Sequence, residues 1–150
     1  MRFVEAEAAF RAGPATLDRA YRAYRAGIIA HMDKIGVLGA ARDSYMSSPA
    51  VAQSAAALTL KNIMQQKYIA LFMNPESWVD LRKLDYDQNI YTGFYYPLNP
   101  NPIAVNNTAN PYPRRTLYPL TEVQLNPREV EKQGANAQDY FLKPLWWNVQ

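Results

Sequence analysis

Histidine and cysteine, the side chains most often used in nucleophilic and metal chemistry, are almost missing from this chain. His31 is the only histidine, and the sequence contains no cysteine. A serine nucleophile needs a histidine base, and structural zinc needs several cysteine or histidine ligands. A lone histidine is typical of a solvated or hydrogen-bonded surface residue. The sequence therefore predicts neither a catalytic triad nor a zinc site.

The segment that begins at Asp85 has the opening of a calcium-binding loop. Asp85, Asp87 and Asn89 occupy the first, third and fifth positions of such a loop. The sixth position, which needs glycine for a sharp turn, is Ile90, and the twelfth, which needs glutamate, is Tyr96. The pattern favours a turn closed by Asp and Asn side chains over a metal site, so we expect no metal and no cofactor.

Carboxylates that could cleave a glycosidic bond are present, but their spacing indicates no catalytic pair. Glu76 and Asp80 lie one helical turn apart, and Asp80 lies three residues before Lys83, as on a solvated helix face. Asp85, Asp87 and Glu122 complete the set, and nothing fixes a separation of the retaining or the inverting kind. The spacing therefore gives no specific support for a glycan-cleaving enzyme, which stays a rival interpretation, and no residue is predicted to be catalytic.

The aromatic residues that follow Trp78 suggest a ligand surface. They are joined by Asn and Gly rather than by charged residues. Aromatic faces stack on sugar rings, and amide side chains hydrogen-bond to sugar hydroxyls. The alternative is that the rings pack this loop onto the helices. The candidate ligand-binding residues are Tyr86, Asn89, Tyr91, Tyr95 and Tyr96.

Composition sets the class of protein. The chain has 150 residues, 49% of them hydrophobic and 19% charged, as in a globular protein with a core. A mean hydropathy of −0.35 argues against a transmembrane helix. The net charge is +3, but the arginines are spread among acids, so we expect no nucleic-acid partner.

The first half, residues 1–84, is alanine-rich and predicts helices. Phe3, Ala6 and Phe10 indicate a short helix that ends at Gly13 and Pro14. Thr16 is expected to cap a second helix, which runs to Gly36. Its predicted inward stripe consists of Leu17, Tyr21, Tyr24, Ile28 and Met32.

A third helix is expected from Ser48-Pro49, a start signal, to about Met73. Its predicted inward residues are Ala57, Leu60, Met64, Tyr68 and Leu71. A fourth, short helix follows Asn74, over the residues PESWVDLRKL.

The first 34 residues have the size of one tetratricopeptide-like helix pair, which cannot bury its apolar faces alone. The chain also opens inside a helical pattern, without a cap or a turn before it. We therefore expect residue 1 to be either a boundary within a longer protein or a true start with a bare helix end.

The second half changes to Tyr, Asn and Pro, with seven of the eleven prolines between Pro97 and Pro127. Proline removes backbone donors and fixes φ, so this part predicts ordered irregular chain. The resulting expectation is a single all-α fragment of tetratricopeptide-like helix pairs with long irregular loops. It is helical over 1–84, loop-rich over 85–127, and has a tail with a short helix over 128–150.

Four motifs follow one another along the chain: FVEAEAAFRAG, QQKYIALFMNPESWVDLRK, PRRTLYPLTEVQLNP and LWWN. Together they resemble the C-terminal part of the SusD/RagB family of outer-membrane nutrient-binding lipoproteins. Tyr68 stands where the family often has tryptophan, and Ser77 where alanine is common. The matching positions are Gln66, Lys67, Ile69, Ala70, Leu71, Glu76, Trp78, Asp80, Arg82, Arg115, Tyr118, Pro119, Glu122, Asn126, Trp146 and Trp147.

The resemblance implies a non-catalytic receptor at the surface of the outer membrane. Such proteins bind oligosaccharide, or peptide in RagB-like branches, and deliver it to a SusC-type TonB-dependent transporter. A lipid anchor is expected on a preceding N-terminal part of the protein. The alternative for these 150 residues is a scaffold and transporter-contact portion without a ligand site of its own.

The proline-rich segment around PRRTLYPLTEVQLNP is expected to act as a structural clasp. An arginine can bind a carboxylate bidentately, and Tyr-Pro lays a ring on the scaffold. Asp80 is the expected partner of Arg115, and Asn126 is expected to cap a last short helix around REVEKQ. The predicted clasp consists of Trp78, Asp80, Arg82, Arg115, Tyr118, Glu122 and Asn126.

Overall fold

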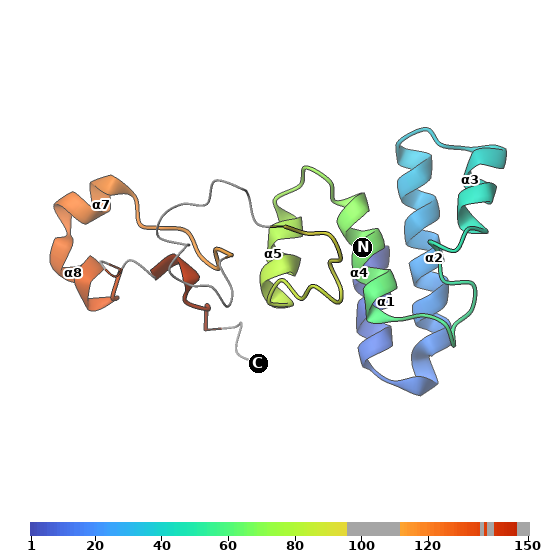
Figure 1. The fold of residues 1–150 in the computed structure, drawn as a ribbon, viewed down its shortest axis with the longest axis horizontal. Coiled ribbons are helices and arrows are strands. Elements are labelled where there is room, and N and C mark those ends of the chain that lie inside the picture. Colours follow the sequence, from blue (N-terminus) through green and yellow to red (C-terminus); the bar gives the residue numbers. More distant parts are fainter. Residues whose placement is uncertain (96–111, 136, 138–139, 147–150) are drawn as a thin grey trace. The chain divides into compact units, whose positions relative to one another are not determined.

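The computed structural model describes residues 1–95, 112–135, 137 and 140–146 (Figure 1). Every regular element in this part of the chain is a helix, which confirms the all-α fold class. The chain divides into two compact units, Met1–Gly93 and Phe94–Gln150. The first unit holds the longer helices, and the second holds two short helices and a short 3-10 turn.

Helices α1 (Arg2–Arg11) and α2 (Leu17–Lys34) form the predicted antiparallel hairpin. Gly13 adopts a left-handed φ of 109° between them, which a residue with a side chain would rarely take. The expected Thr16 cap on α2 is wrong. Its hydroxyl instead donates to the carbonyl oxygens of Ala9 (2.6 Å) and Gly13 (2.9 Å), and this closes the turn onto α1.

Small residues bring α1 and α2 close together. Ala6 and Ala20 are fully buried, and a Cβ at Gly27 would lie 2.9 Å from the Phe3 ring, so a larger residue there would have to displace that ring. Of the predicted α2 stripe, Tyr24, Ile28 and Met32 are buried, whereas Leu17 and Tyr21 are half-buried. The 3.6-residue periodicity therefore predicted the inner part of the stripe correctly.

The predicted third helix is wrong over 48–59. The structure has a short helix α3 (Gly39–Met46), which the sequence did not indicate, then irregular chain, then α4 (Leu60–Ala70). Val51 and Leu58 are buried in the irregular part, so tertiary packing overrides helix propensity there. Helix α4 begins at a capping box in which Thr59 and Asn62 hydrogen-bond each other's backbone.

The buried face of α4 also differs from the prediction. Ile63, Met64 and Lys67 are buried, while Tyr68 and Ala57 lie at the surface. Helix α4 packs on both α1 and α2 (Figure 1). Its register is set by polar partners for Gln66 and Lys67, which an apolar pattern does not reveal.

Helix α5 (Glu76–Lys83) confirms the predicted fourth helix. The chain after it turns sharply, with Asp85 and Tyr86 at φ of 51° and 55°. Tyr86 and Tyr91 are buried, so the loop up to Gly93 belongs to the first unit.

The second unit contains α7 (Leu120–Leu125), α8 (Pro127–Lys132) and the 3-10 turn η2 (Tyr140–Leu142). Helix α8 confirms the predicted last helix, but α7 was expected to be irregular. Asn126 makes no side-chain cap. Its Nδ2 donates instead to Oε1 of Glu122, 2.8 Å away on α7, so that prediction is corrected.

Candidate functional site

A cluster of buried charges joins three helices of the first unit. Lys67 on α4 lies with its Nζ 2.7 Å from Oδ1 of Asp80 on α5 and 3.9 Å from Oε2 of Glu7 on α1. All three residues are at most 8% exposed. A charge in such surroundings is tolerated only with a partner, so this cluster fixes how α1, α4 and α5 pack.

Glu7 is the acceptor at the centre of this cluster. Lys83 Nζ lies 2.8 Å and Arg11 Nε 3.0 Å from its Oε1. Burial alone would raise the pKa of Glu7, but hydrogen bonds and charges from Lys83, Arg11 and Lys67 together lower it. Glu7 is therefore held as a carboxylate and is a structural residue rather than a proton donor.

Tyr91 lies beside the same cluster. It is 4% exposed, and burial, followed by the charges of Asp80 and Glu7, raises the pKa of its hydroxyl. The ring packs edge-on against Tyr68, with 5.9 Å between ring centroids. A sugar platform needs an open ring face, so the prediction that Tyr91 presents one is wrong.

Tyr86 is also packed inside the unit. It is 4% exposed, and its hydroxyl accepts a hydrogen bond of 2.8 Å from Trp78 Nε1. The Arg82 guanidinium lies 3.8 Å from the centre of the Trp78 ring, one helical turn away. Tyr86 is thus corrected from a platform residue to a packing residue.

The turn at Asp87 has the geometry that its sequence predicts. Oδ1 of Asp87 accepts hydrogen bonds from the backbone N (2.8 Å) and the Nδ2 (2.9 Å) of Asn89. Within the described part of the chain, no three acidic or histidine side chains are grouped as metal ligands.

Two of the remaining candidates are open to solvent. Asn89 is exposed, and Tyr95 is 82% exposed. Tyr96, the last candidate of that group, lies outside the described residues. His31, which the sequence left as a surface residue, is half-buried on α2.

A partly exposed patch that the sequence did not indicate lies on α4, beside the loop at Thr92. Tyr68 is 36% exposed, and Gln65, three residues earlier on the same face, donates from Nε2 to the Thr92 hydroxyl at 2.9 Å. Ring, amide and hydroxyl therefore lie on one helix face and the loop beside it. The sequence prediction placed Tyr68 in the buried stripe and therefore missed this patch. The buried ion pair between Lys67 and Asp80 shows which face of α4 points inward.

The second unit has its own network around Arg115. Its Nε donates to the carbonyl of Lys143 at 2.9 Å, and its guanidinium also donates to the carbonyl of Pro144 and lies 4.8 Å from the Tyr140 ring centre. The backbone N–H groups of Arg114 and Arg115 donate to the carbonyl of Phe141. Arg115 thus ties the proline-rich segment to the C-terminal turn. The partners that the structure gives Arg115 and Asp80 differ from the predicted Arg115–Asp80 pair.

Tyr118 extends this network. Its ring centroid lies 5.9 Å from that of Tyr140, and a hydrogen bond with Tyr140 raises the pKa of Tyr118. The second unit also contains the hydrogen bond between Glu122 and Asn126. The predicted clasp residues therefore fall into two groups: Trp78, Asp80 and Arg82 in the first unit, and Arg115, Tyr118, Glu122 and Asn126 in the second.

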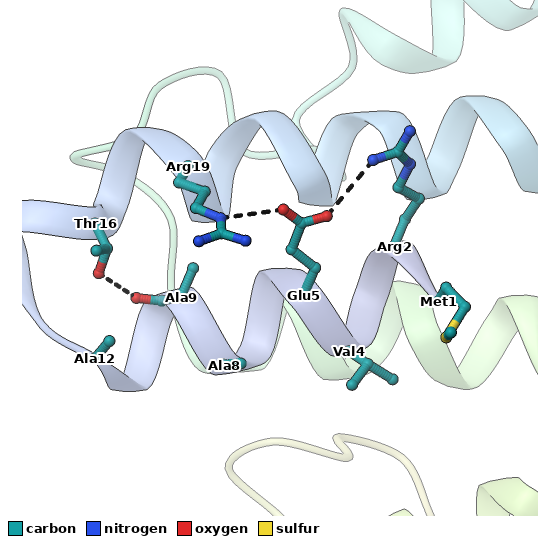
Figure 2. A pocket seen from close by; sticks show the side chains of 9 residues that line it. All are labelled: Met1, Arg2, Val4, Glu5, Ala8, Ala9, Ala12, Thr16 and Arg19. Atoms are coloured by element: carbon teal, nitrogen blue, oxygen red, sulfur yellow. Dashed lines mark hydrogen bonds and ion pairs between the residues drawn. The ribbon is translucent and has the colours of Figure 1, made fainter.

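The outward face of α1 carries a shallow groove of about 590 Å³ (Figure 2). Val4 and Ala8 on α1, together with Met1 and Ala12 at its two ends, line the groove. Figure 2 also shows Glu5 between Arg2 and Arg19, the latter contributed by α2. The groove has apolar walls and a charged rim but no aromatic ring.

Comparison with protein-family models identifies the family to which the chain belongs. The model of the SusD-like_2 family, described as starch-binding associating with outer membrane, matches residues 1–119. This is well over half of the chain, so the protein belongs to the SusD-like family. No curated protein and no solved structure matches it. Where the structure describes the chain, none of its helices combines the length and apolar character needed to span a bilayer.

Proposed function

We propose that this protein binds oligosaccharide at the surface of the outer membrane without cleaving it, and delivers it to a SusC-type TonB-dependent transporter. The match to a family of starch-binding proteins associated with the outer membrane carries this proposal. The absence of a catalytic constellation in the sequence agrees with it.

Within this chain, Tyr68 is the proposed stacking platform. Its ring is held at an angle of 65° to Tyr91, which is itself buried, so a sugar would meet a fixed surface. The Gln65 amide and the Thr92 hydroxyl, fixed by their mutual hydrogen bond, supply donors and acceptors for sugar hydroxyls. Asn89 and Tyr95 remain proposed contacts because both are exposed.

The non-catalytic part of the proposal is supported by the state of the buried carboxylates. Glu7 and Asp80 both lie within 3 Å of a lysine ammonium group. A carboxylate held in an ion pair with a lysine is a poor general acid, and glycosidases need a general acid.

A scaffold role is the second candidate for these residues, and the burial of Tyr86 and Tyr91 favours it. In that case the ligand would be bound by another part of the protein. The transporter contact would then be the only function carried here.

Affinity electrophoresis through gels containing soluble starch distinguishes the two. Tyr68→Ala should weaken retardation by about 5–30-fold in apparent Kd, the scale of a modest hot spot of 1–2 kcal/mol. Ile69→Ala is the matched control, since Ile69 is the exposed neighbour on α4 without a ring. No retardation of the wild type would assign this chain to the scaffold, and equal retardation of all three proteins would place the sugar contact away from Tyr68.

A further inference from the structure

A lysine stands in line with the Tyr68 patch, which consists of Gln65, Tyr68 and Thr92. Lys61, Gln65 and Tyr68 follow one another at intervals of four and three residues, so they form one row along α4. At 1.5 Å per residue, Lys61 and Tyr68 are separated by about 10 Å along the helix axis. The long, flexible stem of a lysine lets its ammonium group reach into that gap. Lys61 therefore lies next to the place where Tyr68 is proposed to stack on a sugar ring.

This row is turned away from the core of the first unit. Ile63, Gln66 and Lys67 are buried and lie on the opposite face of α4. Lys61 and Gln65 are half-buried and Tyr68 is exposed, so solvent reaches all three side chains. A glycan that stacks on Tyr68 can therefore contact Lys61 without any rearrangement of the helix.

The structure gives the charge of Lys61 no stabilising role. In the part of the chain that the structure describes, its ammonium group makes neither an ion pair nor a hydrogen bond. The lysines at 67 and 83, by contrast, both have carboxylate partners. Lys61 also lies in the first turn of α4, which contains no acidic residue and where the helix dipole disfavours a cation. Its positive charge is therefore available to a ligand.

The chemistry of Lys61 selects among glycans. An ammonium group gains more from an anionic acceptor than from a hydroxyl, because both members of the hydrogen bond are then charged. The Gln65 amide and the Thr92 hydroxyl suit neutral sugar hydroxyls and bring no charge of their own. Ring, neutral polar groups and cation together match a sugar chain that carries an anionic group.

We propose that the site at Tyr68 prefers acidic glycans, in which a carboxylate, sulfate or phosphate lies close to the stacked sugar ring. Tyr68 stacks on the ring, Gln65 and Thr92 bind its hydroxyls, and Lys61 binds the anionic group. This inference rests on the proposed binding of oligosaccharide at Tyr68 and names the class of glycan that the site prefers. Neutral starch is held by the ring and hydroxyl contacts alone.

The test compares soluble starch with carboxymethyl starch and starch sulfate, which share its glucan backbone. Binding of each polymer to the immobilised 150-residue chain is measured by biolayer interferometry at low ionic strength. At least one acidic polymer should bind about threefold to fivefold more tightly than soluble starch, the scale of one partly exposed ion pair. Near 1 M salt, where the Debye length is about 3 Å, this difference should disappear while soluble starch still binds. The polymer that binds more tightly identifies the preferred anion.

Variants locate the charge that is responsible. Lys61→Gln should remove the preference for acidic polymers and leave the affinity for soluble starch unchanged, whereas Lys61→Arg should keep the preference. Lys34→Gln, at an exposed position on α2, is the matched control. It lowers the net charge by the same amount, so it measures the general attraction between a basic protein and a polyanion. Circular dichroism verifies that each variant folds.

The remaining outcomes overturn the proposal, and they separate it from the proposed function. Equal affinity of the wild type for all three polymers shows that Lys61 selects no anion, while sugar binding stands. A preference that survives in Lys61→Gln, or that falls equally in Lys34→Gln, belongs to the net charge of the protein. Binding of no polymer by the wild type contradicts the proposed function itself, and this inference with it.

Discussion

The ammonium group of Lys67 lies 2.7 Å from Oδ1 of Asp80, and each side chain is about one-tenth exposed. Lys67 comes from α4 and Asp80 from α5, so the ion pair links these two helices. Removing one member of such a pair leaves the other charged and desolvated, whereas removing both does not.

Lys67→Met is therefore expected to lower the free energy of unfolding by about 3–5 kcal/mol, since it leaves Asp80 and Glu7 without their shared cation. Urea unfolding followed by helical circular dichroism measures the loss. The double variant Lys67→Met with Asp80→Leu should recover part of it. A loss below about 1 kcal/mol for the single variant would show that the pair is solvated.

Acid should destabilise the protein through Glu7. Its pKa in the folded state lies below the ordinary value of 4.5, so at acid pH the unfolded chain binds the proton more readily. This contribution to stability is present above pH 4.5 and is lost as the pH falls through the folded-state pKa.

The measurement is the urea midpoint between about pH 6 and pH 3. Glu7→Gln should be less stable than the wild type near neutral pH and should show a flatter decline. Glu131→Gln, at an exposed position on α8, serves as the control and should follow the wild-type curve. Parallel curves for wild type and Glu7→Gln would contradict the assignment.

Much of the first unit could be predicted from sequence because α1 and α2 are periodic and Gly13-Pro14 separates them. The region after Ser48-Pro49 could not, because its start signal is local, whereas the structure buries Val51 and Leu58 in irregular chain. A pattern of apolar residues also cannot predict that Lys67 is buried.

The candidate site was predicted only in part for the same reason. Aromatic content marked the loop after Trp78, yet the burial of each ring depends on tertiary partners. Tyr86 is buried by the indole that hydrogen-bonds to it, and Tyr91 lies beside the Asp80 charge. The Asp87–Asn89 turn was predictable because its hydrogen bonds are local.

Arg115→Ala should loosen the proline-rich segment of the second unit. It removes hydrogen bonds to the carbonyls of Lys143 and Pro144 and the contact with the Tyr140 ring. A loss of about 1–2 kcal/mol corresponds to roughly 5–30-fold faster exchange of the Arg114 amide, which is bonded to Phe141. Arg115→Lys keeps the positive charge but loses the paired N–H donors of the guanidinium group, so it should recover little of the protection of the Arg114 amide against exchange. Full protection in Arg115→Lys would show that charge alone is responsible.

Met73 is a strained position in the turn between α4 and α5. Its φ is 62°, and its side chain is almost fully exposed, so no packing compensates for the left-handed backbone. Met73→Gly should raise the free energy of unfolding by about 0.5–1 kcal/mol, the part of the strain left after the entropy cost of glycine. Met73→Ala keeps the Cβ and should gain nothing. A gain in both variants would assign the effect to the lost apolar surface.

Binding without cleavage is the central claim, and one sample can test both halves of it. The chain is incubated with soluble starch, and the same mixture is assayed for retardation in an affinity gel and for newly formed reducing ends. The account predicts saturable retardation with no increase in reducing ends. Release of reducing ends in proportion to protein, or no retardation by starch or any other polysaccharide in a panel, would contradict it.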